Sequence, residues 1–196
     1  MKRVAPVVLL ALCYGLLLVP SFSRRQEETK PEFPTKDQIT LLVTQAKHAF
    51  DLYENTLGLE SQLSDAQTML AGDRQVLTAA RTVIGYLEKE PERFNSTLGF
   101  TLVTTLDDAS RNAAVCMGQG ATQAAMAGQR GDASSGQAKL NVSRACADAS
   151  ILLTTVSESA ASLYLDYQQA SDKLLRKAFQ AADKCNQALK KLSKQP

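Results

Sequence analysis

Residues 137–194 read QAKLNVSRACADASILLTTVSESAASLYLDYQQASDKLLRKAFQAADKCNQALKKLSK, and this run contains neither glycine nor proline. Apolar residues recur along it at helical spacing, close to one in every 3.6 residues. They are Val142, Ala145, Ala149, Leu152, Val156, Ala160, Leu163, Tyr167, Ala170, Leu174, Ala178, Ala181, Cys185, Leu189 and Leu192. The pattern predicts one very long helix or two helices with a break near 157–162. A single helix would be about 85 Å long, so we expect a kink or break.

The same periodicity extends toward the N-terminus. Thr35 and Gln38 fit a capping box and predict a helix that begins at Thr35 and ends near Gly58. A second helix is expected over 64–90, where Pro91 ends it, and a third over 97–117. The threonine-rich first half of that third segment leaves a strand as the alternative.

Residues 118–136 hold five of the ten glycines, which predicts a glycine-rich loop or a frayed hairpin tip between the third helix and the long C-terminal run. Small residues dominate the expected packing faces and allow helices to approach closely. These small residues are Ala109, Ala113, Ala145, Ala149, Ala170, Ala178 and Ala182. The sequence therefore predicts an all-α, up-and-down bundle of four or five helices over 35–196, with a long C-terminal helical region. A coiled coil is the alternative.

The N-terminus predicts export. Residues 1–23 combine Lys2 and Arg3 with an apolar run and small residues at Ser21 and Ser23, the pattern of a cleaved signal peptide. An uncleaved signal anchor is the alternative. Residues 24–34 are polar, contain two prolines and predict a flexible arm. We therefore expect a secreted, extracellular protein without stable membrane insertion.

Two sequons accompany this predicted export signal. They begin at Asn95 and Asn141, and both are expected to be glycosylated on exposed helix ends. Cleavage after Ser23 would remove Cys13 together with both N-terminal basic residues, so the remaining chain would be formally neutral.

Three cysteines then remain for disulfide formation. The midpoint between Cys116 and Cys146 is Gly131, inside the glycine-rich segment, so two antiparallel helices joined there would bring both thiols to the same height. We predict this disulfide. Cys185 is left as either a buried free thiol or an intermolecular bridge, because an unpaired cysteine in an exported chain suggests a dimer.

The composition offers little for catalysis. The chain has one histidine, no tryptophan and a net charge of +2, which disfavours multi-histidine metal sites and nucleic-acid binding. His48 is expected on a surface or interface. Asp107 and Asp108 are expected on a solvated face, since neighbouring residues in a helix point about 100° apart.

The aromatic residues Tyr164, Tyr167 and Phe179 indicate core packing or the wall of a ligand cavity. We predict no enzyme, no cofactor and no resident metal.

The stretch from Cys146 to Leu189 resembles insect secreted proteins of the tsetse EP-domain type. The resemblance rests on Cys146, the sequence YQQA at 167–170 and the sequence AFQAADKC at 178–185, and it covers about a quarter of the chain. It implies a helical, exported, non-enzymatic protein. Plant invertase and pectin-methylesterase inhibitors also join a signal peptide to a helical bundle, but their paired N-terminal cysteines are absent here.

The expected function is protein binding or self-assembly, with a possible dimer through Cys185. The alternative is an extracellular carrier of a small apolar ligand. A large enclosed apolar cavity would favour the carrier, whereas exposed apolar helix faces would favour assembly.

Overall fold

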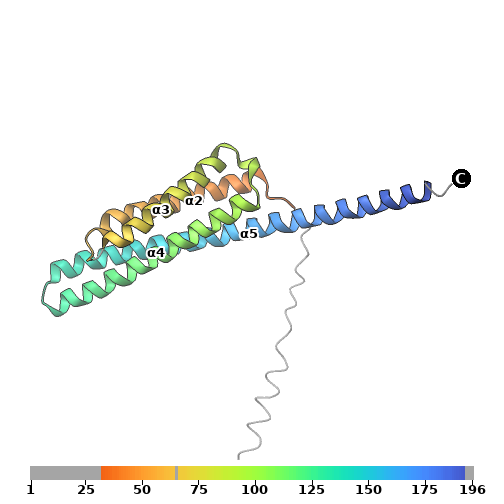
Figure 1. Ribbon diagram of the computed structural model, residues 1–196. Coiled ribbons are helices and arrows are strands. Elements are labelled where there is room, and N and C mark those ends of the chain that lie inside the picture. The colour runs from red at the N-terminus through yellow and green to blue at the C-terminus, as the bar shows by residue number, and fades with distance from the viewer. Residues whose placement is uncertain (1–31, 65, 193–196) are drawn as a thin grey trace, which may run out of the picture. The chain divides into compact units, whose positions relative to one another are not determined.

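The computed structural model describes residues 32–64 and 66–192, and in this part of the chain it contains helices and no strand (Figure 1). The elements are α2 (Lys36–Glu60), α3 (Ala66–Lys89), the 3₁₀ helix η1 (Pro91–Arg93), α4 (Ser96–Gln129) and α5 (Ala133–Leu192). The predicted all-α bundle is confirmed, and the strand alternative for the third segment is wrong. The predicted signal peptide and most of the predicted arm, up to residue 31, lie outside the described residues.

The four long helices run alternately up and down. The α2–α3 hairpin packs along the α4–α5 hairpin, so that α2 contacts α5 and α3 contacts α4 (Figure 1). One apolar cluster fills the space between them. Its largest fully buried members are Leu42, Tyr53, Leu87, Leu102, Leu106 and Leu153.

The start of α2 is the capping box that the sequence predicts. The Thr35 side chain accepts a hydrogen bond from the Gln38 backbone N–H, and the Thr35 N–H donates to the Gln38 side chain. The helix continues past the predicted stop at Gly58 and ends at Glu60. A Cβ placed on Gly58 would meet nothing within 4 Å, so this glycine is an ordinary helical residue.

The predicted loop over 118–136 is wrong, although the tip of a helical hairpin does lie in this segment. Helix α4 continues to Gln129 and α5 begins at Ala133, so the chain reverses within a few residues around Gly131, whose φ is 75°. Gly120 serves helix packing instead. A Cβ there would lie 3.0 Å from the Lys139 carbonyl oxygen and 3.0 Å from the Ser143 backbone nitrogen. The absence of a side chain at this position lets α4 and α5 approach closely.

The predicted break near 157–162 is also wrong, because α5 is one helix of 60 residues. Its length is about 90 Å at 1.5 Å per residue. Ser157 is buried, and its hydroxyl donates to Asp107 of α4, so the serine-rich segment contributes to packing and does not bend. The buried face of α5 is formed by Val142, Cys146, Ala149, Leu153, Val156, Ala160 and Ala170.

The last part of α5 extends beyond the bundle (Figure 1). Up to Gln187, where the description of side-chain burial ends, Ala170 is the last buried residue, and every residue from Leu174 to Gln187 is exposed. The cause is a difference in length, since α4 has 34 residues and cannot cover all of α5. Within the described residues, no helix is both long enough and apolar enough to cross a membrane.

Candidate functional site

A pair of buried carboxyl groups lies where the end of α2 meets the first half of α3. Glu60 is 0% exposed and Asp73 is 1% exposed. The Tyr53 hydroxyl donates a hydrogen bond of 2.5 Å to one oxygen of Asp73. Neither oxygen of Glu60 has a hydrogen-bond donor, and the second oxygen of Asp73 has none. Burying a charged carboxylate without a hydrogen-bond donor costs free energy, so a bound proton or cation would stabilise the pair.

The electrostatics of the pair favour a shared proton. Burial and the charge of Asp73 together raise the pKa of the Glu60 carboxyl to about 8. Burial also raises the pKa of the Tyr53 hydroxyl above its usual range, with a contribution from its bond to Asp73. At neutral pH Glu60 therefore keeps its proton and can donate it toward Asp73.

Neither buried acidic residue was predicted from the sequence, although the position of each carried a signal. Glu60 follows Tyr53 by seven residues and therefore belongs to the apolar face of α2. Asp73 precedes Leu77 by four residues and belongs to the apolar face of α3 in the same way. An acidic residue in phase with an apolar stripe indicates a buried carboxyl.

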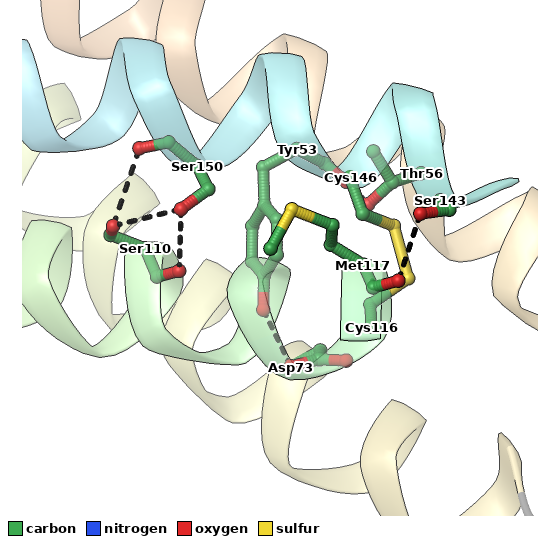
Figure 2. The surroundings of a disulfide bond; sticks show 9 residues. All are labelled: Tyr53, Thr56, Asp73, Ser110, Cys116, Met117, Ser143, Cys146 and Ser150. Atoms are coloured by element: carbon green, nitrogen blue, oxygen red, sulfur yellow. Dashed lines mark hydrogen bonds between the residues drawn. A yellow bond between two sulfur atoms is a disulfide. The ribbon is translucent and has the colours of Figure 1, made fainter. Parts of the chain in front are cut away.

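The predicted disulfide is confirmed, and it lies beside this carboxyl pair. Cys116 of α4 and Cys146 of α5 are bonded, with their Cα atoms 6.0 Å apart. Figure 2 shows Tyr53 directed at Asp73 next to the bridge. Both cysteine sulfurs and a carboxylate oxygen of Glu60 lie within 4.8 Å of one another. Among the residues that the structure describes, this is the one group of three side chains with the spacing of metal ligands.

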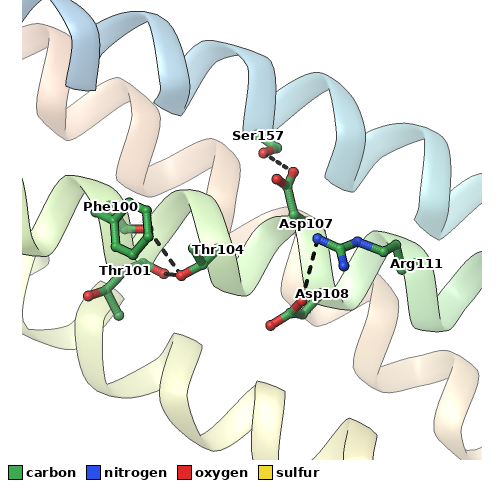
Figure 3. A network of polar contacts seen from close by, with 7 residues as sticks. All are labelled: Phe100, Thr101, Thr104, Asp107, Asp108, Arg111 and Ser157. Carbon is green, nitrogen blue, oxygen red and sulfur yellow. Dashed lines mark hydrogen bonds and ion pairs between the residues drawn. The ribbon is translucent and has the colours of Figure 1, made fainter.

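The adjacent acidic residues of α4 do not form a pair. Asp107 accepts a hydrogen bond of 2.5 Å from the Ser157 hydroxyl of α5, whereas Asp108 lies 3.7 Å from the guanidinium of Arg111 on its own helix (Figure 3). The expected solvated face therefore holds for Asp108 but not for Asp107, which joins two helices. His48 is exposed on α2, as predicted.

Cys185 lies on the part of α5 that extends beyond the bundle, where its thiol is free and exposed. The buried-thiol alternative is therefore wrong. Leu174, Leu175 and Phe179 on the same part of the helix are exposed by 55%, 54% and 73%. Exposed apolar side chains that gather on one segment are typical of an interaction surface.

The predicted aromatic group does not form as a unit. The Tyr167 ring lies edge-on to Phe33 and Phe94, with ring centroids 5.2 Å and 5.9 Å away. The Tyr164 ring lies 6.2 Å from that of Phe100. Phe179 is more than two turns further along α5 and contributes to the exposed surface.

The two sequon asparagines have different surroundings. Asn95 caps α4, because its side-chain oxygen accepts a hydrogen bond from the Leu98 N–H. Asn141 is exposed but lies inside α5, not at a helix end as predicted. The Ser143 hydroxyl of its sequon donates to the Met117 carbonyl between α4 and α5. Glycosylation of either asparagine stays a prediction.

Three hollows on the bundle surface are open to solvent. One, of about 420 Å³, is lined by polar and apolar residues of α4 together with Ser64. Another, of about 200 Å³, lies between α2 and α3 and is rimmed by Lys47, Asp51, Arg81 and Glu88. The third, of about 350 Å³, is lined by residues of α2 and α5. None of the three is the enclosed apolar cavity that a ligand carrier would use.

Comparison with protein-family models, curated proteins and solved structures gives no match for this chain. The resemblance to secreted EP-domain proteins therefore stays a prediction.

Proposed function

We propose that this is an exported, non-enzymatic bundle that works by protein binding, and that the protein it binds is a second copy of itself. The contact surface would be the exposed apolar side of α5 beyond the bundle, which we name the extension face. It consists of Leu174, Leu175, Ala178, Phe179, Ala181 and Cys185. The high exposure of its large apolar side chains is the observation that carries this proposal.

The residue types and the spacing of the extension face are those of a surface on which two helices pack together. Leu174, Ala178, Ala181 and Cys185 follow one another at steps of four, three and four residues, so they lie along one side of the helix. The alanines permit close approach of a second helix. The basic residues Lys173, Lys177 and Lys184 flank one edge of this stripe, and Arg176 lies opposite it, so all four can stay solvated in a dimer.

Pairing would also supply the packing that this part of α5 lacks. Isolated helices shorter than about 12–15 residues are marginal in water, and most helices in proteins are stabilised by packing of an apolar face. The exposed part from Leu174 to Gln187 spans about 20 Å at 1.5 Å per residue. Burial of its leucine and phenylalanine side chains would contribute roughly 1.5–3 kcal/mol for each one fully covered.

Cys185 favours a second copy over an unrelated partner. In an oxidising compartment an exposed thiol forms a disulfide readily, and parallel pairing of two α5 helices through the extension face would bring the two Cys185 residues together. An unrelated partner would need a free cysteine of its own at the matching height.

The test compares two doubly substituted chains. Leu174→Ser with Phe179→Ser removes the apolar contact, and Ile151→Ser with Leu41→Ser is the matched control, since these residues are also exposed but lie outside the extension face. We expect a Cys185–Cys185 bridge in non-reducing gels of the native and control chains and its loss in the first variant. Equal bridging in all three, or a Cys185 that stays unbridged in the native chain, would contradict the proposal.

A further inference from the structure

We propose that reduction of the Cys116–Cys146 disulfide creates a binding site for a borderline-soft divalent cation such as Zn²⁺. The ligands are the two thiolates and the Glu60 carboxylate, with Asp73 as the fourth. The site is independent of the proposed dimer, because it lies inside the bundle and shares no residue with the extension face.

The unpartnered oxygens of Glu60 point to a ligand. This side chain is 0% exposed and neither oxygen has a hydrogen-bond donor. One of its oxygens lies within 4.8 Å of both cysteine sulfurs, so the carboxylate is directed at the bridge. The second Asp73 oxygen also lacks a donor. A divalent cation between the sulfurs and the carboxylates would take the place of the proton that otherwise neutralises this buried pair.

The spacing of the ligand atoms fits tetrahedral zinc. Zinc binds thiolate sulfur at about 2.3 Å and carboxylate oxygen at about 2.0–2.2 Å, so neighbouring ligand atoms lie roughly 3.5–3.8 Å apart. A carboxylate oxygen of Glu60 is within 4.8 Å of both sulfurs, so a shift of about 1 Å would bring it to ligand distance. After reduction the two sulfurs, no longer bonded at about 2.05 Å, would separate to the roughly 3.8 Å that tetrahedral zinc requires. The three grouped ligands come from α2, α4 and α5, and Asp73 of α3 would move toward the sulfurs to complete the set.

The disulfide and the metal exclude each other, because both need the same sulfurs. A dithiol reductant supplies two electrons and two protons, becomes a disulfide itself and leaves two thiols on the protein. Metal binding then displaces both thiol protons and the proton that Glu60 and Asp73 share. Two thiolates and two carboxylates against one Zn²⁺ have the same formal charge as a four-cysteine zinc site. The chain would hold the cation before its disulfide forms and release it on oxidation.

The experiment measures zinc bound by the chain from Arg24 onward, with Cys185→Ser so that only the bridge cysteines can supply thiolates. The protein is treated with a phosphine reductant, given Zn²⁺ alone and freed of excess metal by gel filtration. We expect about one zinc per reduced chain and none above background in the oxidised chain. Co²⁺ in place of Zn²⁺ should give the intense near-ultraviolet absorption of a cobalt–thiolate bond in the reduced chain. Absence of zinc and of this absorption would overturn the proposal.

Substitution of the carboxylate separates the proposed site from a simple pair of thiols. Glu60→Gln should weaken zinc binding by at least roughly tenfold, while the control Glu158→Gln, an exposed residue of α5, should leave it unchanged. Circular dichroism of each reduced variant verifies that its helices are intact. Equal affinity of the Glu60→Gln chain and the native chain would contradict the ligand role of Glu60.

Discussion

The buried Glu60 carboxyl makes the stability of the fold depend on pH in an unusual direction. Its pKa rises from 4.5 in the unfolded chain to about 8 in the folded protein. Between these values the folded state binds one more proton than the unfolded state, so the free energy of unfolding falls as the pH rises. The stabilisation is fully present below pH 4.5 and is lost as the pH rises through about 8.

The size of the effect follows from the same shift. Each pKa unit corresponds to about 1.4 kcal/mol, so Glu60 changes the free energy of unfolding by on the order of 5 kcal/mol across this window. Glu60→Gln removes the titration while it keeps a neutral side chain that can still donate toward Asp73. The variant should therefore lose this contribution to the pH dependence and gain stability relative to the native chain as the pH rises.

The assay is urea unfolding of the oxidised chain with a metal chelator present, followed by circular dichroism at several values between pH 5 and pH 8.5. Other carboxyl groups titrate in both proteins, so the relevant quantity is the difference in unfolding free energy between native and variant chains. The exposed control Glu158→Gln should show a difference that does not vary with pH. A Glu60→Gln difference that stays equally constant would refute the raised pKa of Glu60.

Three further changes test the packing. Gly120→Ala should destabilise the bundle by about 1–3 kcal/mol, because the new Cβ would meet the α5 backbone. Gly118→Ala has open space around it and should stabilise the bundle by up to about 1 kcal/mol. Urea unfolding that ranks the two variants the other way would contradict the close contact at Gly120. Replacing Cys116 and Cys146 together by serine should cost about 3–4 kcal/mol for a closed loop of this length, and an unchanged thermal midpoint would argue against the bridge. Thr35→Ala should cost about 1 kcal/mol through loss of the helix cap, and no loss in the same assay would contradict the capping box.

Short sequence motifs predicted the parts of the fold that depend on residues near one another in the chain or on simple helix periodicity. The capping box at Thr35 needs only the side chains of one helical turn. The disulfide was predictable because Cys116 and Cys146 lie at equal distances from Gly131, where the chain reverses. The helical periodicity was strong enough to identify the bundle as a class.

The errors concern residues whose role depends on a neighbouring helix. Gly120 was interpreted as part of a loop, yet it lies in a helix where α5 passes too close for a side chain. Ser157 was placed in a break, yet its hydroxyl is bonded to Asp107 across the helix interface. Glycine and serine weaken an isolated helix, and the sequence alone does not show the packing that compensates.

The candidate site was missed because acidic residues were assumed to face solvent. Glu60 and Asp73 each share the phase of an apolar stripe, so their burial was open to prediction. The proximity of Glu60, Asp73 and the disulfide could not be predicted, since it depends on how α2 packs against α3 and on the position of the disulfide along the α4–α5 hairpin. The extension of α5 beyond the bundle likewise required the lengths of both helices in the α4–α5 hairpin.

The most direct test of the proposed self-association is sedimentation equilibrium of the chain from Arg24 onward across a range of concentrations, with and without reductant. We predict a covalent dimer under oxidising conditions and a reversible, concentration-dependent dimer when Cys185 is reduced. A monomer at every concentration in both conditions would contradict pairing through the extension face.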